Sequence, residues 1–292
     1  MQIDGKTRMA AVVANPIRHS LSPFIHNEAF RLTDENGVYV AWEVAENDLA
    51  QTLANIRLLD MYGVNLSMPF KQLAMWYVNE LSEEAKLIGA INTIVNVNGQ
   101  LVGHNTDGIG FFKSLSEEQN FDVAGKELTV LGGGGAAVAI IATAALQKAA
   151  KINVFARRSS SFAALKSKIE TLSALTKVDI QLTDLADEKL LADGIASSSL
   201  LANATSIGMD GMTNPLPEAF AFPENLLVAD VIYKVAETPL LKAAKLQGCA
   251  MVNGLGMLLY QAAESFKLWT GKTMPADEIR AALTEKFAHE KS

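Results

Sequence analysis

The 292-residue chain is poor in several features that mark whole classes of protein. Its single cysteine, Cys249, excludes an intrachain disulfide and a metal site made of several cysteines. Basic residues are fewer than acidic ones, 25 against 32, and the net charge of −7 argues against nucleic acid or an anionic membrane as the main partner. No spacing of ligand-type residues suggests a metal site. We therefore expect no metal and no nucleic-acid partner.

Long apolar runs are also missing. No stretch approaches the ~18 uninterrupted apolar residues of a membrane span. The N-terminal segment carries Asp4, Lys6 and Arg8 instead of the apolar core of a secretion signal. The sequence therefore predicts a cytoplasmic protein with no membrane partner.

What is present is typical of a globular protein with two domains. Hydrophobic residues make up 49% of the chain and charged residues 20%, and the length is sufficient for two cores. The most informative segment is a turn of four glycines that follows a short apolar strand at 128–131. In order, the turn and the helix start are Gly132, Gly133, Gly134, Gly135 and Ala136.

Such a strand, turn and helix are what a dinucleotide pyrophosphate requires. Gly132 permits a tight bend, Gly134 lets the backbone approach the phosphates, and the helix N-terminus offers N–H groups to the anion. A merely flexible turn is the alternative. The flanking strand and helix favour cofactor binding.

The second strand of this region indicates which nicotinamide cofactor binds. An NAD site usually has an acidic residue about 20 positions after the glycines, yet no Asp or Glu occurs between Glu127 and Glu170. The strand instead ends in Ala156, Arg157, Arg158 and Ser159. Guanidinium and hydroxyl groups suit a 2′-phosphate, which favours NADP, with NAD possible. The alternative is a solvated strand end followed by a serine cap.

The order of strands and helices predicts an α/β fold. Strands expected at 128–131, 152–156, 179–182, 200–203, 227–230 and 250–252 alternate with helices, which indicates a doubly wound parallel sheet. Strands expected at 9–14, 38–43, 63–67, 93–97 and 101–104 precede it, with Asn98-Gly99 as a hairpin signal. We expect an N-terminal α/β substrate domain, residues 1–107 completed by helices in 255–292, plus a Rossmann-type doubly wound NAD(P)-binding domain, residues 108–254.

The N-terminal part contains three polar clusters that a packed core does not explain. They are His19-Ser-Leu-Ser-Pro23, Asn65-Leu-Ser-Met-Pro-Phe-Lys71, and the pair Gly89-Ala-Ile-Asn-Thr93 and Gly103-His-Asn-Thr-Asp-Gly108. Alternating hydroxyls and amides supply the donors and acceptors that a polyhydroxylated ligand needs. Taken singly, each cluster is equally compatible with a helix cap, a turn or a surface lysine.

Seven segments in order give the chain a wider resemblance. They are Asn15-Pro-Ile-Arg-His-Ser-Leu-Ser-Pro, Asn65-Leu-Ser-Met-Pro-Phe-Lys, Gly89-Ala-Ile-Asn-Thr, Gly103-His-Asn-Thr-Asp-Gly, the glycine turn, Asn203-Ala-Thr-Ser-Ile-Gly-Met and Asn253-Gly-Leu-Gly-Met-Leu-Leu-Tyr-Gln-Ala-Ala. Together they closely resemble the shikimate dehydrogenase family, including its quinate/shikimate branch. The resemblance covers nearly the whole chain.

The resemblance implies reversible reduction of 3-dehydroshikimate to shikimate in the shikimate pathway, which leads to chorismate and the aromatic amino acids. It implies that Lys71 and Asp107 lie at the reacting centre and that Ser20 and Ser22 hold the substrate carboxylate. The other implied substrate-binding residues are Asn65, Ser67, Asn92, Tyr233 and Gln261. The implied cofactor-binding residues are the glycine turn, the 156–159 segment, Thr205, Val231 and Gly254.

A lysine and a carboxylate bonded to the reacting hydroxyl can polarise it and relay its proton, an effect worth ~10²–10⁴ in rate. An ion pair would keep Lys71 protonated, whereas a base must be neutral, so the residue that takes the proton is open. Our hypothesis is that Lys71 is the acid/base group and Asp107 orients it.

Two departures from the common family pattern leave an alternative open. Ser67 replaces a frequent threonine, and the strand end Phe155-Ala-Arg-Arg-Ser159 resembles the quinate-using branch but lacks its Asp. A quinate/shikimate dehydrogenase using NAD or NADP is therefore the second reading. A non-catalytic, ligand-sensing regulator is less compatible, because Lys71 and Asp107 are present. The expected partner is a small-molecule substrate, and we expect a monomer or a homodimer.

Overall fold

The computed structural model describes residues 3–217 and 220–289, which separate into two compact units. Unit 1 is Met1–Thr106 together with Leu259–Ser292, and unit 2 is Asp107–Leu258. The sequence-based boundaries were 107 and 254. Helix α10 (Gly254–Thr270) carries the chain from unit 2 back into unit 1.

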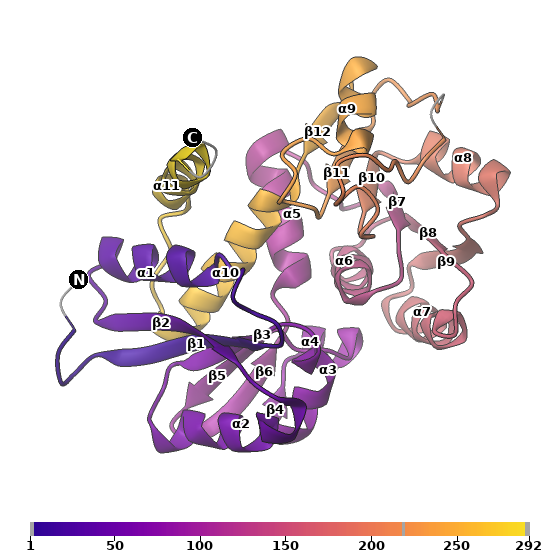
Figure 1. Ribbon diagram of the computed structural model, residues 1–292. Helices are drawn as coiled ribbons and strands as arrows, with labels where there is room; N and C mark the ends of the chain where they lie inside the picture. Colours follow the sequence, from indigo (N-terminus) through magenta and orange to yellow (C-terminus); the bar gives the residue numbers. More distant parts are fainter. Residues whose placement is uncertain (1–2, 218–219, 290–292) are drawn as a thin grey trace. The chain divides into compact units, whose positions relative to one another are not determined.

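Unit 1 is built on a six-stranded mixed sheet with the order β2-β1-β3-β5-β6-β4 (Figure 1). Strand β1 pairs in parallel with β2 and β3, whereas β5 is antiparallel to β3 and β6. Its elements are β1 (Arg8–Ala14), α1 (Ser22–Leu32), β2 (Gly37–Glu43), η1 (Glu46–Asp48), α2 (Leu49–Leu58), β3 (Gly63–Leu66), α3 (Phe70–Leu73), η2 (Ala74–Tyr77), β4 (Glu80–Leu81), α4 (Glu83–Ile88), β5 (Thr93–Val97), β6 (Gln100–His104), most of α10, and α11 (Ala276–His289).

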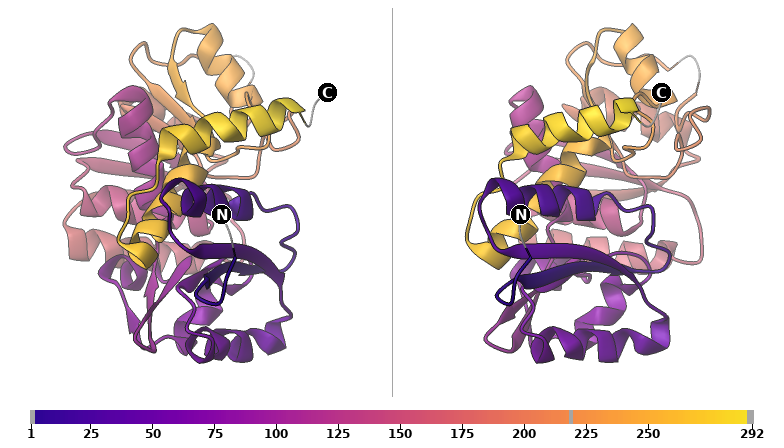
Figure 2. Two further views of the ribbon diagram at one scale, coloured as in Figure 1. Left: turned by 90° about the vertical axis from the view of Figure 1, so that its left-hand side faces the viewer. Right: turned by 60° about the vertical axis from the view of Figure 1, so that its left-hand side comes forward.

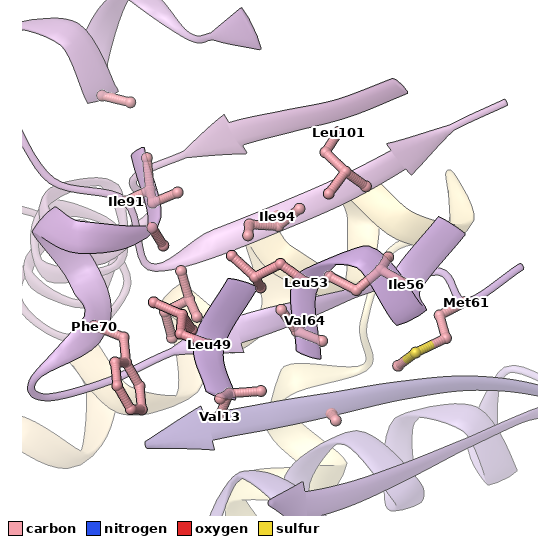
Figure 3. Packing of buried hydrophobic residues seen from close by; sticks show 14 residues of the cluster. Val13, Leu49, Leu53, Ile56, Met61, Val64, Phe70, Ile91, Ile94 and Leu101 are labelled. Carbon is pink, nitrogen blue, oxygen red and sulfur yellow. The ribbon is translucent and has the colours of Figure 1, made fainter. Parts of the chain in front are cut away.

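The two faces of this sheet carry different side chains because successive strand residues point to opposite sides. Val64 and Leu66 of β3 and Ile94 of β5 pack with the apolar stripe of α2, formed by Leu49, Leu53 and Ile56 (Figure 3). Asn65 and Thr93 therefore point to the opposite face. The packing of α2 on one face fixes the direction of the polar side chains on the other.

The opposite face is covered by α1 and α10. Helix α11 contacts α1 and lies beside it in both views of Figure 2. The ring of Trp269 in α10 donates a hydrogen bond from Nε1 to the carbonyl of Ile94, at 3.0 Å. This contact anchors α10 directly on β5.

Unit 2 is a six-stranded sheet with the order β12-β11-β10-β7-β8-β9, and every pairing is parallel. This is the strand order of a doubly wound dinucleotide-binding fold, so the predicted α/β fold class is confirmed. Its elements are α5 (Asp107–Gln119), β7 (Glu127–Leu131), α6 (Gly135–Leu146), β8 (Lys151–Ala156), α7 (Phe162–Thr176), β9 (Asp179–Asp184), α8 (Glu188–Ser197), β10 (Leu200–Asn203), β11 (Leu227–Asp230), α9 (Pro239–Leu246) and β12 (Ala250–Val252).

Two local features differ from the sequence-based expectation. The sequence pattern from Lys71 to Val78 predicts a single helix, but this segment forms a short α-helical segment, α3, followed by the 3₁₀ turn η2. Trp76 and Tyr77 have only moderate helix propensity, and Ala74 is the buried residue of η2, so packing supports no longer helix. Strand β4, two residues long, carries too little pattern to be predicted.

Candidate functional site

In unit 1, the side chain of Asn65 lies inside a network of hydrogen bonds. Its Oδ1 accepts from the Tyr39 hydroxyl at 2.7 Å. Its Nδ2 lies 3.0 Å from both Thr93 Oγ1 and Ser265 Oγ, and 3.2 Å from the carbonyl oxygen of Asn92. Asn65 is thus fixed by residues of β2, β5 and α10.

Asn92 and Gln261 extend this network. Thr106 donates its backbone N–H to Asn92 Oδ1 at 2.9 Å, and Asn92 Nδ2 donates to Thr106 Oγ1 at 2.9 Å. Asn92 Nδ2 also reaches Gln261 Oε1 at 3.4 Å. The side-chain amides of Asn65, Asn92 and Gln261, far apart in the sequence, therefore lie around three buried residues with hydroxyl groups. We call these residues the hydroxyl cluster: Thr93, Thr106 and Ser265.

The predicted carboxylate-binding serines lie at the start of α1. Ser20 Oγ accepts the backbone N–H of Ser22 at 3.2 Å, which shapes the entry to the helix. Burial raises the pKa of Tyr39 well above its ordinary value, and its hydrogen bond with the Ser22 side chain opposes that rise. Because Tyr39 also binds Asn65, Ser22 is connected to the amide network.

Ser67 and Lys71 follow the end of β3. Ser67 donates its backbone N–H to the carbonyl of Val13 at 3.1 Å, and Phe70 closes a turn on the carbonyl of Ser67 at 2.9 Å. Lys71, half-buried in α3, accepts the N–H of Ile91 on its backbone carbonyl at 2.8 Å. That bond holds the backbone of Lys71 against the residue next to Asn92.

Asp107 directly follows Thr106 and begins helix α5. Asp107 is buried, with 7% of its surface exposed. A carboxylate in the first turn of a helix is stabilised by the positive end of the helix dipole. The backbone of the neighbouring Thr106 is held by Asn92 within unit 1.

In unit 2, the glycine turn opens a cavity of about 300 Å³ at the carboxyl ends of β7, β8 and β10. Gly132 has φ +116°, in a region that favours glycine. A Cβ on Gly134 or Gly135 would meet no atom within 4 Å. The predicted residues that line the cavity are Gly132, Gly133, Gly134, Ala156, Arg157, Ser159 and Thr205.

The two adjacent arginines are placed differently. Arg157 lines the cavity, whereas the cavity lining in the described chain does not include Arg158. Arg158 instead donates from Nε to Asp184 Oδ2 at 2.9 Å, and its guanidinium lies over the ring of Phe162. Of the two arginines, Arg157 is therefore the one that lies beside the cavity.

The other predicted residues of unit 2 lie outside the cavity lining. Gly135 and Ala136 form the first turn of α6. Val231 and Tyr233 follow β11, and burial raises the pKa of the Tyr233 hydroxyl. The backbone of Gly254 donates to the carbonyl of Ile232 at 3.0 Å, and a Cβ there would lie 2.1 Å from the carbonyl oxygen of Val231. Gly254 is thus required for the close approach of α10 to the segment after β11.

Sequence reasoning missed several residues that hold the site. In unit 2, Asn203 accepts the Thr205 hydroxyl at 2.7 Å and donates to the buried carboxylate of Asp230 at 3.1 Å. Burial raises the pKa of Asp230, and hydrogen bonds from the Ile232 N–H and other donors oppose the rise. In unit 1, Tyr39 and Ser265 were missed. Ser265 lies one helical turn after Gln261, a spacing that could have identified it.

The residues at 3–217 and 220–289 include no group of three or more His, Cys, Asp or Glu side chains placed to hold a metal ion. Within the same ranges, every helix is too short or too polar to cross a membrane.

Known proteins with similar sequences and structures identify the family. Residues 12–94 match the shikimate dehydrogenase substrate binding domain, and residues 254–284 match the shikimate 5'-dehydrogenase C-terminal domain. The chain is 59% identical over 279 residues to a shikimate dehydrogenase (NADP(+)) of Lactococcus lactis, which covers 96% of this chain and 97% of the relative. It is 55% identical over 287 residues to the same enzyme of Streptococcus suis, with 98% and 99% covered.

A solved structure gives the same result. The shikimate 5-dehydrogenase of Listeria monocytogenes, in complex with shikimate and NAD, is 41% identical and superposes with a TM-score of 0.93 over 97% of this chain and 98% of the other. Sequence, fold and the order of the polar segments agree. The chain therefore belongs to the shikimate dehydrogenase family.

Proposed function

We propose that the chain catalyses the reversible, NADP-linked reduction of 3-dehydroshikimate to shikimate. The observation that carries this proposal is the convergence of Asn65, Asn92 and Gln261 on the hydroxyl cluster in unit 1. Such a set of fixed amides suits a rigid ring that bears several hydroxyls. The names of the close relatives support the same substrate and cofactor.

The residues of unit 2 fit a phosphorylated dinucleotide. The N-terminus of α6 offers backbone N–H groups, and the open space at Gly134 and Gly135 allows a pyrophosphate to approach them. Arg157 and Ser159 at the cavity provide a cation and a hydroxyl for a 2′-phosphate. When bound, the nicotinamide accepts or supplies the hydride.

The chain's own residues would manage the proton. We assign Lys71 as the acid/base group at the reacting oxygen and Asp107 as the group that orients it. Ser20 and Ser22 would hold the substrate carboxylate, and Ser67 and Tyr233 would complete the substrate contacts. The cytoplasmic location and the monomeric or homodimeric state stay predictions.

A quinate/shikimate dehydrogenase of mixed cofactor use is the second candidate. The paired arginines after β8 favour it, whereas the binding of Arg158 to Asp184 leaves a single guanidinium at the cavity. Initial rates with shikimate and with quinate, each measured with NADP and with NAD, separate the two. We expect the highest kcat/KM for shikimate with NADP. Comparable values for quinate with NAD would support the second candidate, and no turnover in any pair would reject both.

A further inference from the structure

Ser265 makes more contacts than a buried serine in a helix usually does. Its Oγ donates back to the carbonyl of Gln261 at 2.9 Å, as helical serines often do. The same oxygen lies 2.8 Å from Thr93 Oγ1 on β5 and 3.0 Å from Asn65 Nδ2 on β3. Ser265 itself is fully buried. It therefore connects α10 to two strands while making no contact with solvent.

These contacts determine which way the amide of Asn65 faces. An asparagine side chain has two N–H donors on one atom and two lone pairs on the other. The Nδ2 atom has three oxygen neighbours, including the backbone carbonyl of Asn92 at 3.2 Å. A carbonyl only accepts, so the reverse orientation of the amide would place two oxygens against each other. The network thus fixes Nδ2 on the Ser265 side.

This orientation limits what Asn65 can offer a ligand. Both N–H groups point to acceptors within the protein, and Oδ1 accepts one hydrogen bond from the Tyr39 hydroxyl. The second lone pair of Oδ1 has no hydrogen-bond partner among the described residues, because neither nitrogen of the nearby His26 ring forms a hydrogen bond. Asn65 can then accept from a hydroxyl but cannot donate to a carbonyl oxygen.

We infer that Ser265 is a positioning residue, which holds Asn65 as an acceptor for a ring hydroxyl of the substrate. This inference rests on the proposed function. Because Asn65 can only accept, the substrate group that it binds is a hydroxyl that keeps its proton throughout the reaction. It is not the carbonyl that is reduced. Ser265 acts through Asn65 and does not touch the substrate.

The test compares Ser265→Ala with Thr270→Ala, a matched change on the same helix. Thr270 Oγ1 also donates to the carbonyl four residues earlier, that of Phe266, at 2.8 Å, but it belongs to no amide network. We expect Ser265→Ala to raise the KM for shikimate about tenfold, which corresponds to about 1.4 kcal/mol, with kcat and the KM for NADP within about twofold of wild type. Thr270→Ala should leave all three unchanged.

Thr93→Val provides a second route if Ser265→Ala does not fold. It removes the other hydroxyl that accepts from Asn65 while keeping the side-chain shape, and it should raise the same KM. Equal effects of the Ser265 and Thr270 changes, or an unchanged KM for shikimate in a folded variant, would overturn the inference. Wild-type enzyme is assayed alongside, so inactivity of the wild type on shikimate marks failure of the proposed function itself.

Discussion

Proton transfer and the choice of cofactor are each assigned to a single side chain. Lys71 is the side chain assigned to proton transfer, and Arg157, which lines the cavity of unit 2, is the side chain assigned to the 2′-phosphate. For each of them the chain has a residue of the same type that forms an ion pair with another side chain: Lys86 with Glu83, and Arg158 with Asp184. Each assignment can therefore be tested against a matched control.

Replacing Lys71 by Ala should reduce kcat by about 10²–10⁴-fold with little change in the KM for shikimate, because acid/base catalysis acts mainly in the transition state. Lys71→Arg should also be slow, since a guanidinium keeps its proton. Lys86→Ala is the control, because Lys86 is exposed and paired with Glu83. Steady-state kinetics measure the effect. A loss confined to KM would contradict the acid/base role.

Replacing Arg157 by Ala should raise the KM for NADP by tenfold or more and leave the KM for NAD nearly unchanged, because the proposed role of this guanidinium is to bind the 2′-phosphate that NAD lacks. Arg158→Ala should change the KM for NADP less, since Arg158 is bound to Asp184. Kinetics with both cofactors measure the ratio. A larger effect at Arg158 would show that it, and not Arg157, selects the phosphate.

At the scale of an element, helix α1 contains a buried histidine. The His26 ring stacks on Tyr39 with centroids 4.3 Å apart, and among the described residues neither ring nitrogen has a hydrogen-bond partner. Burial lowers the pKa of His26 to about 3 from its ordinary 6.5. The folded protein therefore holds this ring neutral over a pH range in which the unfolded chain binds a proton.

The contribution of His26 to stability is present above pH 6.5 and is lost as the pH falls toward 3. Between these values the free energy of unfolding should fall by up to about 1.4 kcal/mol per pH unit. His26→Phe, which keeps a ring on Tyr39, should reduce that slope, whereas a change at the exposed His19 should not. Urea unfolding at pH 4 to 7 measures it. Parallel curves for wild type and His26→Phe would contradict this account.

The turn between β7 and α6 supports a second prediction at this scale. Gly132→Ala should destabilise the protein by about 1–2 kcal/mol, because φ is positive and the new Cβ would lie 2.9 Å from the carbonyl oxygen of Ala204. Gly134→Ala has space in the free protein and should leave stability within about 0.5 kcal/mol of wild type, yet raise the KM for NADP about tenfold. Thermal unfolding and kinetics separate the two. Equal loss of stability in both variants would refute this distinction.

These elements also show how far sequence reasoning reaches. The alternation of strands and helices predicted both sheets, and Asn98-Gly99 predicted the β5–β6 hairpin, because these signals are local. The partners of Asn65 could not be predicted, since Tyr39, Thr93 and Ser265 meet only through the fold. The difference between Arg157 and Arg158 likewise depends on Asp184, a residue on the neighbouring strand.

For the whole molecule, the important feature is that unit 1 is made of two separate stretches of chain. Phe266 and Leu259 of α10 are fully buried, and Trp269 is bound to β5. The apolar cluster of unit 2, in contrast, has all its members between Leu131 and Met251. The described end of the chain thus contributes large side chains to the core of unit 1.

A chain that stops after Leu258 should therefore lose the structure of unit 1 and keep that of unit 2. Loss of several large core side chains, at about 3–5 kcal/mol each, exceeds what a domain of this size can tolerate. Amide hydrogen exchange should show protection only in 107–258. Lys267→Ala, at an exposed position of α10, is the control. Protection retained at β1 and β3 in the shortened chain would disprove the dependence.

The divided unit has a consequence for synthesis on the ribosome. At about 5–20 residues per second, the ribosome needs about 8 to 30 s to translate the inserted stretch 107–258. Through that interval the nascent N-terminal sheet has no Phe266 or Trp269 to cover one of its faces. Unit 2 can fold first, whereas the earlier-made sheet of unit 1 stays partly uncovered until 259–292 is translated, and slower elongation lengthens the time in which it can aggregate.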